Sequence, residues 1–302
     1  MKKLEFLPVT LPDVSTIYSV TAKYGEGSCQ ASPVAMWSLS DKYGDEYAID
    51  DGILYVHRSR LSDETHRVYL APFGPDPVAG YGKILADAHA CQRKVKFISL
   101  TEKQKQELSR GYPNHFTFSK ERDLFEYIIS QKTFLEFPGK VHARRRTEIR
   151  AFWREFGERT EVENLTKENV DEALCYAKQW VKDNAESKDE IALQSELHVI
   201  EKQLNSFHEL GITGTVIRID GTVFAFCYGI PLNDTCYDVL IEKGDRHFPG
   251  IYRVLRQEST KRNAIKYPYI NFEEDLGVEG LRRLKLSYGP EFFLEKYIAI
   301  ER

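Results

Sequence analysis

The chain has 302 residues, a formal net charge of -4 at pH 7, and 42% hydrophobic and 12% aromatic residues. This length suits one large domain or two of medium size, and the apolar content is ample for a packed core. The charge argues against a protein that coats nucleic acid in bulk, but it is compatible with one basic groove. Five scattered cysteines without a CxxC pair argue against a disulfide framework or a zinc site. Because no signal peptide or transmembrane stretch is apparent, we expect a soluble, cytoplasmic protein.

The first part of the chain predicts a mixture of helices and strands. Helical patterns cover 81–92 and 101–110, whereas 14–24 and 33–40 are either helical or irregular. Strand patterns cover 46–50, 53–57, 67–71 and 95–99. Thr101 is a good N-cap for the last helix, and Asp51-Gly52 is typical of a tight two-residue hairpin turn. Strands that alternate with helices in this order indicate a layered α/β or α+β domain and not a helical bundle.

The second part begins near Phe137-Pro138-Gly139 and repeats a similar order. Helices are expected over 140–157, 169–184, 191–210, 250–263 and 278–286. Strands are expected over 214–219, 223–230, 236–242, 267–272 and 292–299, with Asp220-Gly221 as a hairpin turn. This order of elements is that of a GNAT-type acyltransferase. Hydrophobic periodicity alone leaves this fold as one candidate among several α+β folds. Two half-chains of similar order suggest a tandem pair.

Three consecutive acids, Glu273, Glu274 and Asp275, stand between a predicted strand and a predicted helix. Their mutual repulsion is costly unless something opposes it, and a binding or catalytic pocket is one reason to keep them there. A solvated helix N-terminus is the alternative, because the helix dipole favours acids in that place. A structural ion pair, for instance of Glu274 with Arg282 or Lys285, is a further alternative for each acid.

The stretch around these acids carries a family resemblance. Asn271-x-Glu-Glu-Asp-Leu-Gly-x-x-Gly-Leu-Arg-x-x-Lys-x-Ser-Tyr-x-Pro290 resembles the C-terminal signature of soluble bacterial relatives of the phosphatidylglycerol lysyltransferase C-terminal domain (DUF2156-like). The segments that agree with it are Gly139-Lys140 with Arg146 and Phe152, Ile241-Glu-Lys243 with Gly250-x-Tyr252, Met36-Trp37, Asp51-Gly-x-Leu54 and Phe116-x-Phe118. The resemblance therefore spans most of the chain.

The resemblance implies an α+β fold of two tandem GNAT-like domains, residues 1–136 and 137–302, the second of which carries the signature. Each domain would hold a central mixed, mostly antiparallel sheet flanked by helices. Family relatives with known activity transfer an aminoacyl group from aminoacyl-tRNA to a lipid head group. The resemblance thus implies an aminoacyl- or acyltransferase in which an amine or hydroxyl acceptor attacks the donor carbonyl directly.

Candidate site residues follow from this chemistry. A carboxylate can hold the donor's α-ammonium or act as a general base, and cations can offset the charge of a tetrahedral oxyanion. The expected catalytic residues are Glu242, Glu274 and Asp275. The expected substrate-binding residues are Asn271, Glu273, Arg282, Lys285, Tyr288, Lys243, Gly250 and Tyr252. A basic helix face that could follow tRNA phosphates comprises Lys140, Arg146, Arg150 and Arg154, although such faces are usually only solvated.

The loop at 243–252 bears on the choice of donor. An acyl-CoA enzyme places a Gly-rich loop and a helix N-terminus under the pyrophosphate. Here Gly250 is retained, but Tyr252 stands where a small residue is needed, and Pro249 removes a donor. Aminoacyl-tRNA is therefore the preferred donor, with acyl-CoA as the alternative and no cofactor or metal expected. A non-catalytic module that binds an amino acid or nucleic acid is a second alternative, and peripheral contact with anionic lipid is compatible with the basic helix.

Overall fold

The computed structural model describes residues 4–185 and 190–302. Packing divides the chain into two compact units. Unit 1 comprises Met1–Tyr127, Glu273–Leu286 and Phe292–Arg302, and unit 2 comprises Ile128–Phe272 and Ser287–Glu291. The signature stretch therefore crosses between the units more than once along the sequence. The assignment of residues 1–136 and 137–302 to two GNAT-like domains stays a prediction.

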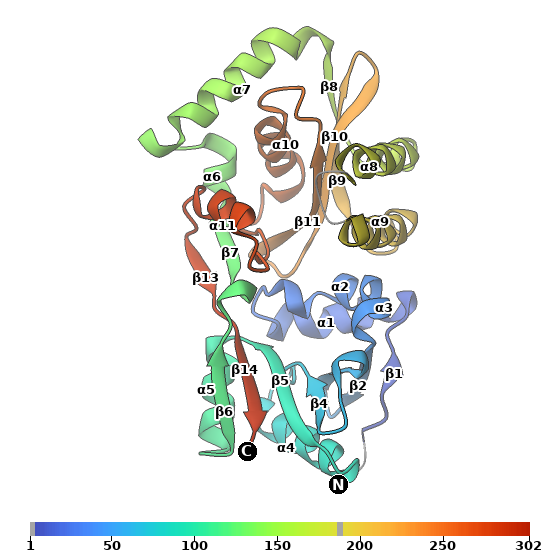
Figure 1. Cartoon of the computed structure of the whole chain (residues 1–302), viewed down its shortest axis with the longest axis vertical. Coiled ribbons are helices and arrows are strands. Elements are labelled where there is room, and N and C mark those ends of the chain that lie inside the picture. Colours follow the sequence, from blue (N-terminus) through green and yellow to red (C-terminus); the bar gives the residue numbers. More distant parts are fainter. Residues whose placement is uncertain (1–3, 186–189) are drawn as a thin grey trace. The chain divides into compact units, whose positions relative to one another are not determined.

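Unit 1 is built around a mixed sheet with the strand order β1-β2-β3-β4-β5-β14-β6 (Figure 1). Its strands are β1 (Leu7–Pro8), β2 (Asp45–Asp50), β3 (Ile53–Arg58), β4 (His66–Tyr69), β5 (Lys94–Leu100), β6 (Phe116–Lys120) and β14 (Tyr297–Glu301). Its helices are α1 (Val14–Tyr24), α2 (Pro33–Ser38), α3 (Ser40–Tyr43), α4 (Pro77–Ala90), α5 (Glu102–Gly111) and α11 (Glu279–Leu286). Only the pair β4 and β5, which α4 connects, is parallel among the described neighbours of this sheet.

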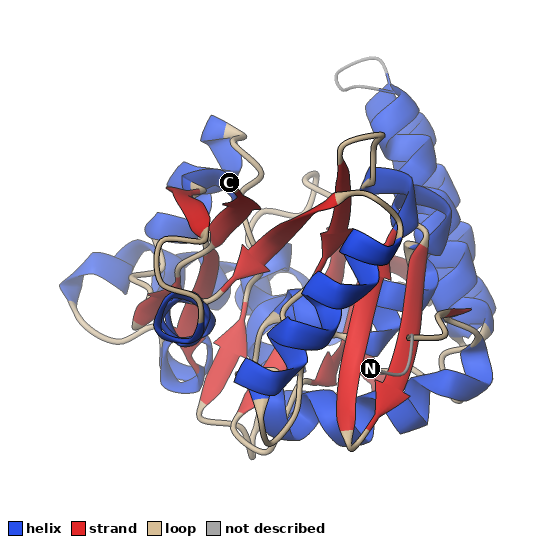
Figure 2. Ribbon diagram, turned by 90° about the horizontal axis from the view of Figure 1, so that it is seen from below, coloured by secondary structure: helices blue, strands red, loops and turns tan. Residues whose placement is uncertain are grey.

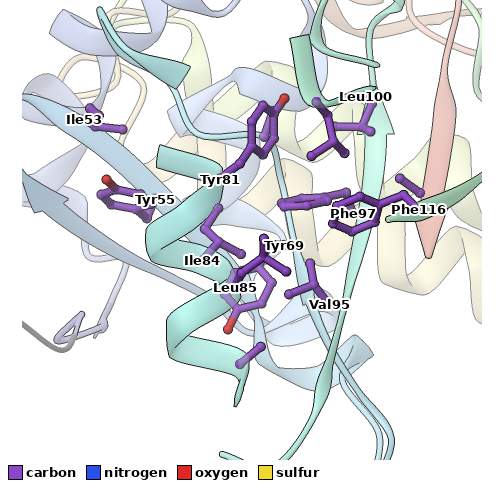
Figure 3. Packing of buried hydrophobic residues seen from close by; sticks show 14 of the residues in the cluster. Ile53, Tyr55, Tyr69, Tyr81, Ile84, Leu85, Val95, Phe97, Leu100 and Phe116 are labelled. Carbon is purple, nitrogen blue, oxygen red and sulfur yellow. The ribbon is translucent and has the colours of Figure 1, made fainter. Parts of the chain in front are cut away.

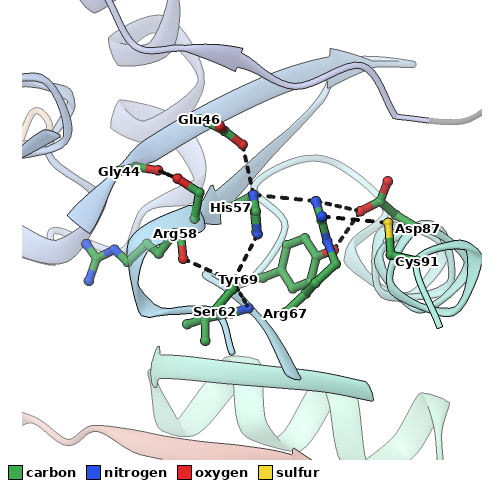
Figure 4. Close-up of polar contacts among 11 residues, drawn as sticks. Gly44, Glu46, His57, Arg58, Ser62, Arg67, Tyr69, Asp87 and Cys91 are labelled. Atoms are coloured by element: carbon green, nitrogen blue, oxygen red, sulfur yellow. Dashed lines mark hydrogen bonds and ion pairs between the residues drawn. The ribbon is translucent and has the colours of Figure 1, made fainter. Parts of the chain in front are cut away.

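The core of unit 1 lies on both faces of this sheet. Because side chains alternate along a strand, Tyr55 of β3 points into one apolar cluster while Leu54 points into the other. The first cluster is packed under α4, and the edge of Tyr81 meets the ring of Phe97 at a centroid distance of 5.2 Å (Figure 3). The second cluster includes Ile17 of α1. Helices thus cover both faces, as a layered α+β domain requires.

Unit 2 holds most of a second sheet, whose strand order is β13-β7-β12-β11-β10-β9-β8. The strands are β7 (Glu126–Ser130), β8 (Thr160–Asn164), β9 (Thr213–Ile219), β10 (Thr222–Pro231), β11 (Cys236–Gly244), β12 (Tyr269–Asn271) and β13 (Phe292–Leu294). The helices are α6 (Gln131–Glu136), α7 (Ala143–Phe156), α8 (Val170–Asn184), α9 (Glu190–Asn205) and α10 (Ile251–Ser259). Strand β13 and the first two residues of β7 belong to unit 1. Helices, blue in Figure 2, flank the red strands.

Two strands in the middle of the second sheet diverge. β11 and β12 are parallel and pair only from Cys236–Tyr269 to Asp238–Asn271, after which β11 continues to Gly244 paired with β10 but not with β12. On the other side of β11, β10 carries an irregularity at Tyr228/Gly229. A side chain at Gly229 would lie 1.9 Å from the carbonyl oxygen of Asp238, so only glycine fits there.

Most local sequence signals are confirmed. Asp51-Gly52 and Asp220-Gly221 both adopt positive φ angles, as the tight hairpin turns between β2 and β3 and between β9 and β10 require. Thr101 caps α5 in a capping box with Gln104.

The predicted single strand over 292–299 is wrong. The chain forms β13 and then β14, which are in different sheets. The break falls at Glu295-Lys296, because the Lys296 side chain is fully buried and bound to Glu126. The predicted helix over 250–263 also ends early, since α10 changes to a π-type turn at Thr260–Ala264.

Candidate functional site

The three-acid segment forms a tightly specified turn in unit 1. Glu273 and Leu276 have φ angles of 54° and 51°, which non-glycine residues seldom adopt. Gly277 follows at 76°, and a side chain there would lie 2.9 Å from a carboxylate oxygen of Asp123. Backbone strain of this kind is found where the surrounding structure fixes a functional loop.

Asp275 is the fixed centre of this turn. Its carboxylate is fully buried and receives hydrogen bonds from both forks of Arg282, Nε to Oδ2 at 3.0 Å and Nη2 to Oδ1 at 2.8 Å. Arg122, the Tyr127 hydroxyl and the Gly277 N–H donate to the same carboxylate at 3.1, 2.5 and 2.9 Å. Burial opposes ionisation, but the hydrogen bonds from Arg282 and Tyr127 still hold the pKa of Asp275 well below its usual range. An acid that stays ionised in this way is suited to holding the loop, not to accepting a proton near neutral pH.

Glu274 points toward a different set of groups. Its Oε1 accepts a hydrogen bond from Gln30 Nε2 at 2.9 Å, and its Oε2 accepts one from Cys29 Sγ at 3.2 Å. Lys285 donates to the Glu274 backbone oxygen at 2.6 Å. Burial lowers the pKa of Lys285, although the nearby Glu273 and Glu274 oppose that effect. Glu274 is therefore a half-buried carboxylate next to a buried amine and a thiol.

A buried ion pair supports the turn that carries Cys29 and Gln30. Glu126 Oε1 and Lys296 Nζ are 2.6 Å apart, and both side chains are 0% exposed. Ser28 Oγ is 2.6 Å from Lys296 Nζ and donates to Glu126 at 2.7 Å, while the Cys29 N–H donates to Glu126 at 3.0 Å. This pair is absent from the sequence-based candidates. The available signal is a charged residue next to or within an apolar strand, as in Phe125-Glu-Tyr-Ile-Ile129 and Lys296-Tyr-Ile-Ala-Ile300.

In unit 2, Glu242 near the end of β11 is bound to Arg256 of α10. Arg256 also donates to the Tyr288 hydroxyl, and its guanidinium lies 5.0 to 5.9 Å from the ring centroids of Tyr288, Phe272 and Tyr252. Burial works against the charge of Arg256, but Glu242 keeps the pKa of Arg256 above its ordinary value. The pair lines a cavity of about 10 Å³ in the second sheet, enough for about one water molecule.

The loop after β11 and the start of α10 are closely packed. Lys243 is buried and bound to Glu196 at 2.6 Å, with its ammonium 4.1 Å from the Trp180 ring. Gly250 has a φ of 94°, and a side chain there would lie 2.9 Å from the Glu148 carbonyl oxygen of α7. The side chain of Phe248 packs on Phe224 at a ring-centroid distance of 4.7 Å.

The basic stripe lies on α7 and the turn before it. Lys140, Arg150 and Arg154 are exposed, whereas Ile149 and Phe152 are buried on the opposite face. Arg146 differs from the other three, because it donates to the carbonyl oxygens of Phe137 and Gly139, the latter at 2.8 Å.

The expected site residues thus fall into two groups. Unit 1 brings together Glu273, Glu274, Asp275, Arg282 and Lys285. Unit 2 holds Glu242, Lys243, Gly250, Tyr252, Asn271, Tyr288, Lys140, Arg146, Arg150 and Arg154. Asn271 is fully buried in register with Asp238, apart from the basic stripe. Their roles stay predictions.

Within residues 4–185 and 190–302, no group of three or more His, Cys, Asp or Glu side chains has the geometry of a metal site. In the same part of the chain, none of the helices combines the length and the apolar character needed to cross a membrane.

Comparison with solved structures identifies the fold. A conserved protein of unknown function from Bacteroides thetaiotaomicron is 29% identical, with a TM-score of 0.91 over 99% of this chain and 100% of that one. L-PGS from Bacillus licheniformis is 16% identical, with a TM-score of 0.65 over 96% of this chain and 92% of that one. FemX is 9% identical, with a TM-score of 0.55 over 99% and 98%. The fold is α+β, as the sequence predicted, and it resembles that of L-PGS and FemX.

Sequence comparison identifies the family. An uncharacterised protein of Mycoplasmoides gallisepticum is 21% identical over 172 residues, which are 57% of this chain and 54% of that relative, so the match spans about half of the relative's length. Residues 21–300 match the family described as "Phosphatidylglycerol lysyltransferase, C-terminal". Since that match covers nearly the whole chain, the protein belongs to the phosphatidylglycerol lysyltransferase C-terminal family.

Proposed function

We propose that this protein transfers an aminoacyl group from aminoacyl-tRNA to an amine or hydroxyl acceptor. The acceptor nitrogen or oxygen attacks the ester carbonyl, the bond to the tRNA 3′-terminal oxygen breaks, and that oxygen takes up the proton which the acceptor loses. Family membership supports a GNAT-like transferase, and FemX and L-PGS share the fold. The finer assignment of donor and acceptor is the proposal.

The observation that carries the proposal is the exposed basic face of α7. Lys140, Arg150 and Arg154 present side chains to solvent, and Arg144 is 89% exposed while bound to Glu148 at 2.8 Å. Helical spacing of four residues puts Arg150 and Arg154 on one side, as a strand of phosphates would require. Because the opposite face of α7 is buried, the arginines are held on a rigid element.

The start of α10 argues against acyl-CoA as the donor. A pyrophosphate would need the helix N-terminus and its N–H groups open to solvent. Here α7 packs so closely on Gly250 that a Cβ would meet the Glu148 carbonyl oxygen, and Arg253 of the first turn is bound to Glu148. The Ile251 N–H already donates to Phe248.

For catalysis, we assign recognition of the donor's α-ammonium to Glu274 and charge compensation to Lys285. Glu274 is half-buried and contacts neutral donors, and Lys285 lies beside it. Asp275, Arg282 and Glu273, which belong to the same unit, then act by holding the turn that carries Glu274. A non-catalytic binding module is the second candidate, because Asp275 with Arg282 and Glu242 with Arg256 are closed into ion pairs.

The test compares binding and transfer. Purified protein is titrated with aminoacylated and uncharged tRNA over a range of salt, and with acetyl-CoA. Replacing Arg150 and Arg154 by alanine should weaken tRNA binding at every salt concentration. The slope of log K against log salt concentration should become shallower by about 0.7 to 0.9 for each phosphate contact that is lost. The exposed Lys167→Ala variant, outside the basic stripe, is the matched control.

Transfer of labelled amino acid from tRNA to a panel of amines, alcohols and phosphatidylglycerol vesicles would establish the reaction. The binding module would be favoured by two results together: the protein binds charged tRNA without transferring the amino acid, and the Glu274→Gln variant binds that tRNA equally well. Tight binding of acetyl-CoA without binding of tRNA would refute the proposed donor.

A further inference from the structure

A pocket of unit 2 runs along one side of α8, and none of the residues assigned above is among those that line it. Its volume is about 880 Å³, within the range of small-molecule sites. Helix α8 contributes Glu172, Cys175, Tyr176, Gln179, Trp180 and Asp183. These positions recur at three- and four-residue intervals, so they form a single stripe of the helix. With a rise of 1.5 Å per residue, the stripe from Glu172 to Asp183 is about 16 Å long.

The opposite wall comes from the sheet and the loop after β11. Phe224 of β10 and the segment Gly244–His247 line this side. The indole N–H of Trp180 donates to the Gly244 carbonyl oxygen at 3.2 Å, which ties the helix to the end of β11. Aromatic surface from Tyr176, Trp180 and Phe224 therefore forms the apolar part of an elongated groove.

Charge along the groove is predominantly negative. Carboxylates lie at both ends of the α8 stripe, Glu172 and Asp183, and Asp245 adds a third from the loop. Arg218 binds Glu172, but it also binds Glu163, so these three groups together keep a net negative charge. The cation that lines the groove beside them is Arg246, while His247 is held by Asp245 at 2.7 Å. A phosphate-bearing ligand would be repelled by this arrangement, and a cation would be attracted.

We propose that this groove binds a linear polyamine. Ammonium groups separated by methylene segments match two carboxylates at the ends of a stripe about 16 Å long, with an aromatic surface between them. A compact cation could not reach both ends, and a neutral chain would leave the carboxylates unmatched. Lys243 lies over the Trp180 ring but is bound to Glu196, so it adds little positive charge to the groove. This inference is independent of the proposed transfer reaction.

The test uses spermidine as the probe and thermal unfolding of the full chain as the readout. Spermidine should raise Tm in a saturable manner, because a ligand that binds only the native state stabilises it by mass action. Added NaCl should weaken the effect. Mg²⁺ at matched ionic strength and the uncharged chain 1,8-octanediol should give much smaller shifts.

Variants locate the site. Asp183 is exposed, so Asp183→Asn should fold normally, and it should weaken spermidine binding by roughly twofold to fivefold, the range for an exposed ion pair. Charge reversal in Asp183→Lys should weaken it further, by on the order of tenfold. Asp234→Asn, in the turn between β10 and β11, is the matched control and should bind as the native protein does. The proposal is overturned by equal effects of Mg²⁺ or octanediol, by equal loss in the control, or by no saturable shift up to about 1 mM spermidine.

Discussion

The Lys296–Glu126 pair offers the sharpest test of how unit 1 supports the acid turn. Both side chains are 0% exposed and lie 2.6 Å apart. If Lys296 is replaced by methionine, the carboxylate of Glu126 stays buried and loses its ammonium partner, while its hydrogen bonds from Ser28 and Cys29 remain. Removing one partner of a buried ion pair costs about 3 to 5 kcal/mol of stability. We expect Lys296→Met to lose an amount in this range.

The companion variants separate the charge effect from packing. In Lys296→Met combined with Glu126→Gln, no uncompensated charge remains, so much of the lost stability should return. Lys120 and Glu295 form a pair of similar length, 2.7 Å, but their side chains are 50% and 36% exposed. Lys120→Met should therefore cost no more than about 1 kcal/mol.

The native protein and the three variants are unfolded in urea at pH 7. Where the dependence of the unfolding free energy on urea concentration is unchanged, a shift of the unfolding midpoint measures the difference in stability. Equal costs for Lys296→Met and Lys120→Met would refute the reasoning, because burial would then not decide the cost. A double variant less stable than Lys296→Met alone would show that the hydrogen bonds to Glu126 matter more than its charge.

Three further outcomes are expected. Arg282→Lys loses the bidentate contact with Asp275, so the free energy of unfolding measured in urea should fall by about 1 to 3 kcal/mol. An unchanged free energy of unfolding would mean that other groups hold the turn. Glu274→Gln should keep the fold, by circular dichroism, and abolish binding of the aminoacyl donor; cooperative loss of folding would instead identify Glu274 as a structural residue. Burial opposes ionisation of Glu301, but the Val95 N–H and His89 lower its pKa below 4.5, so its contribution to stability is complete above that pH and disappears as the pH falls. Glu301→Gln should thus flatten the acid side of a stability–pH profile, and an unchanged profile would refute this.

Local signals predicted the local structure of this chain well. The turns Asp51-Gly52 and Asp220-Gly221 and the N-cap Thr101 depend on neighbouring residues alone, and each is present. The prediction of one strand over 292–299 was wrong because the break between β13 and β14 depends on the contact of Lys296 with Glu126, a residue 170 positions earlier. No local pattern reveals such a partner. The alternation of residues around Lys296 fits one continuous strand equally well.

The same distinction applies to the candidate site. Sequence placed three acids together and predicted that something must oppose their repulsion, and the structure identifies the opposing groups. An ion pair of Glu274 with Arg282 or Lys285 was one alternative from the sequence, but the acid that Arg282 binds in the turn is Asp275. Arg122, from a segment 153 residues away, completes the set and could not be foreseen from spacing.

These contacts indicate a different role for each of the three consecutive acids. Asp275 is enclosed by arginines and a tyrosine hydroxyl, so its charge is used to fix the backbone. Glu273 has the left-handed backbone conformation that turns the chain, and its carbonyl oxygen accepts from the Tyr127 N–H at 3.1 Å. Glu274 is half-buried, and its carboxylate accepts hydrogen bonds from two neutral groups, the side chains of Gln30 and Cys29. A ligand ammonium can replace a neutral donor at lower cost than it can displace a bidentate arginine. A loss of ligand binding without loss of stability should therefore map to Glu274, and a loss of stability to Asp275.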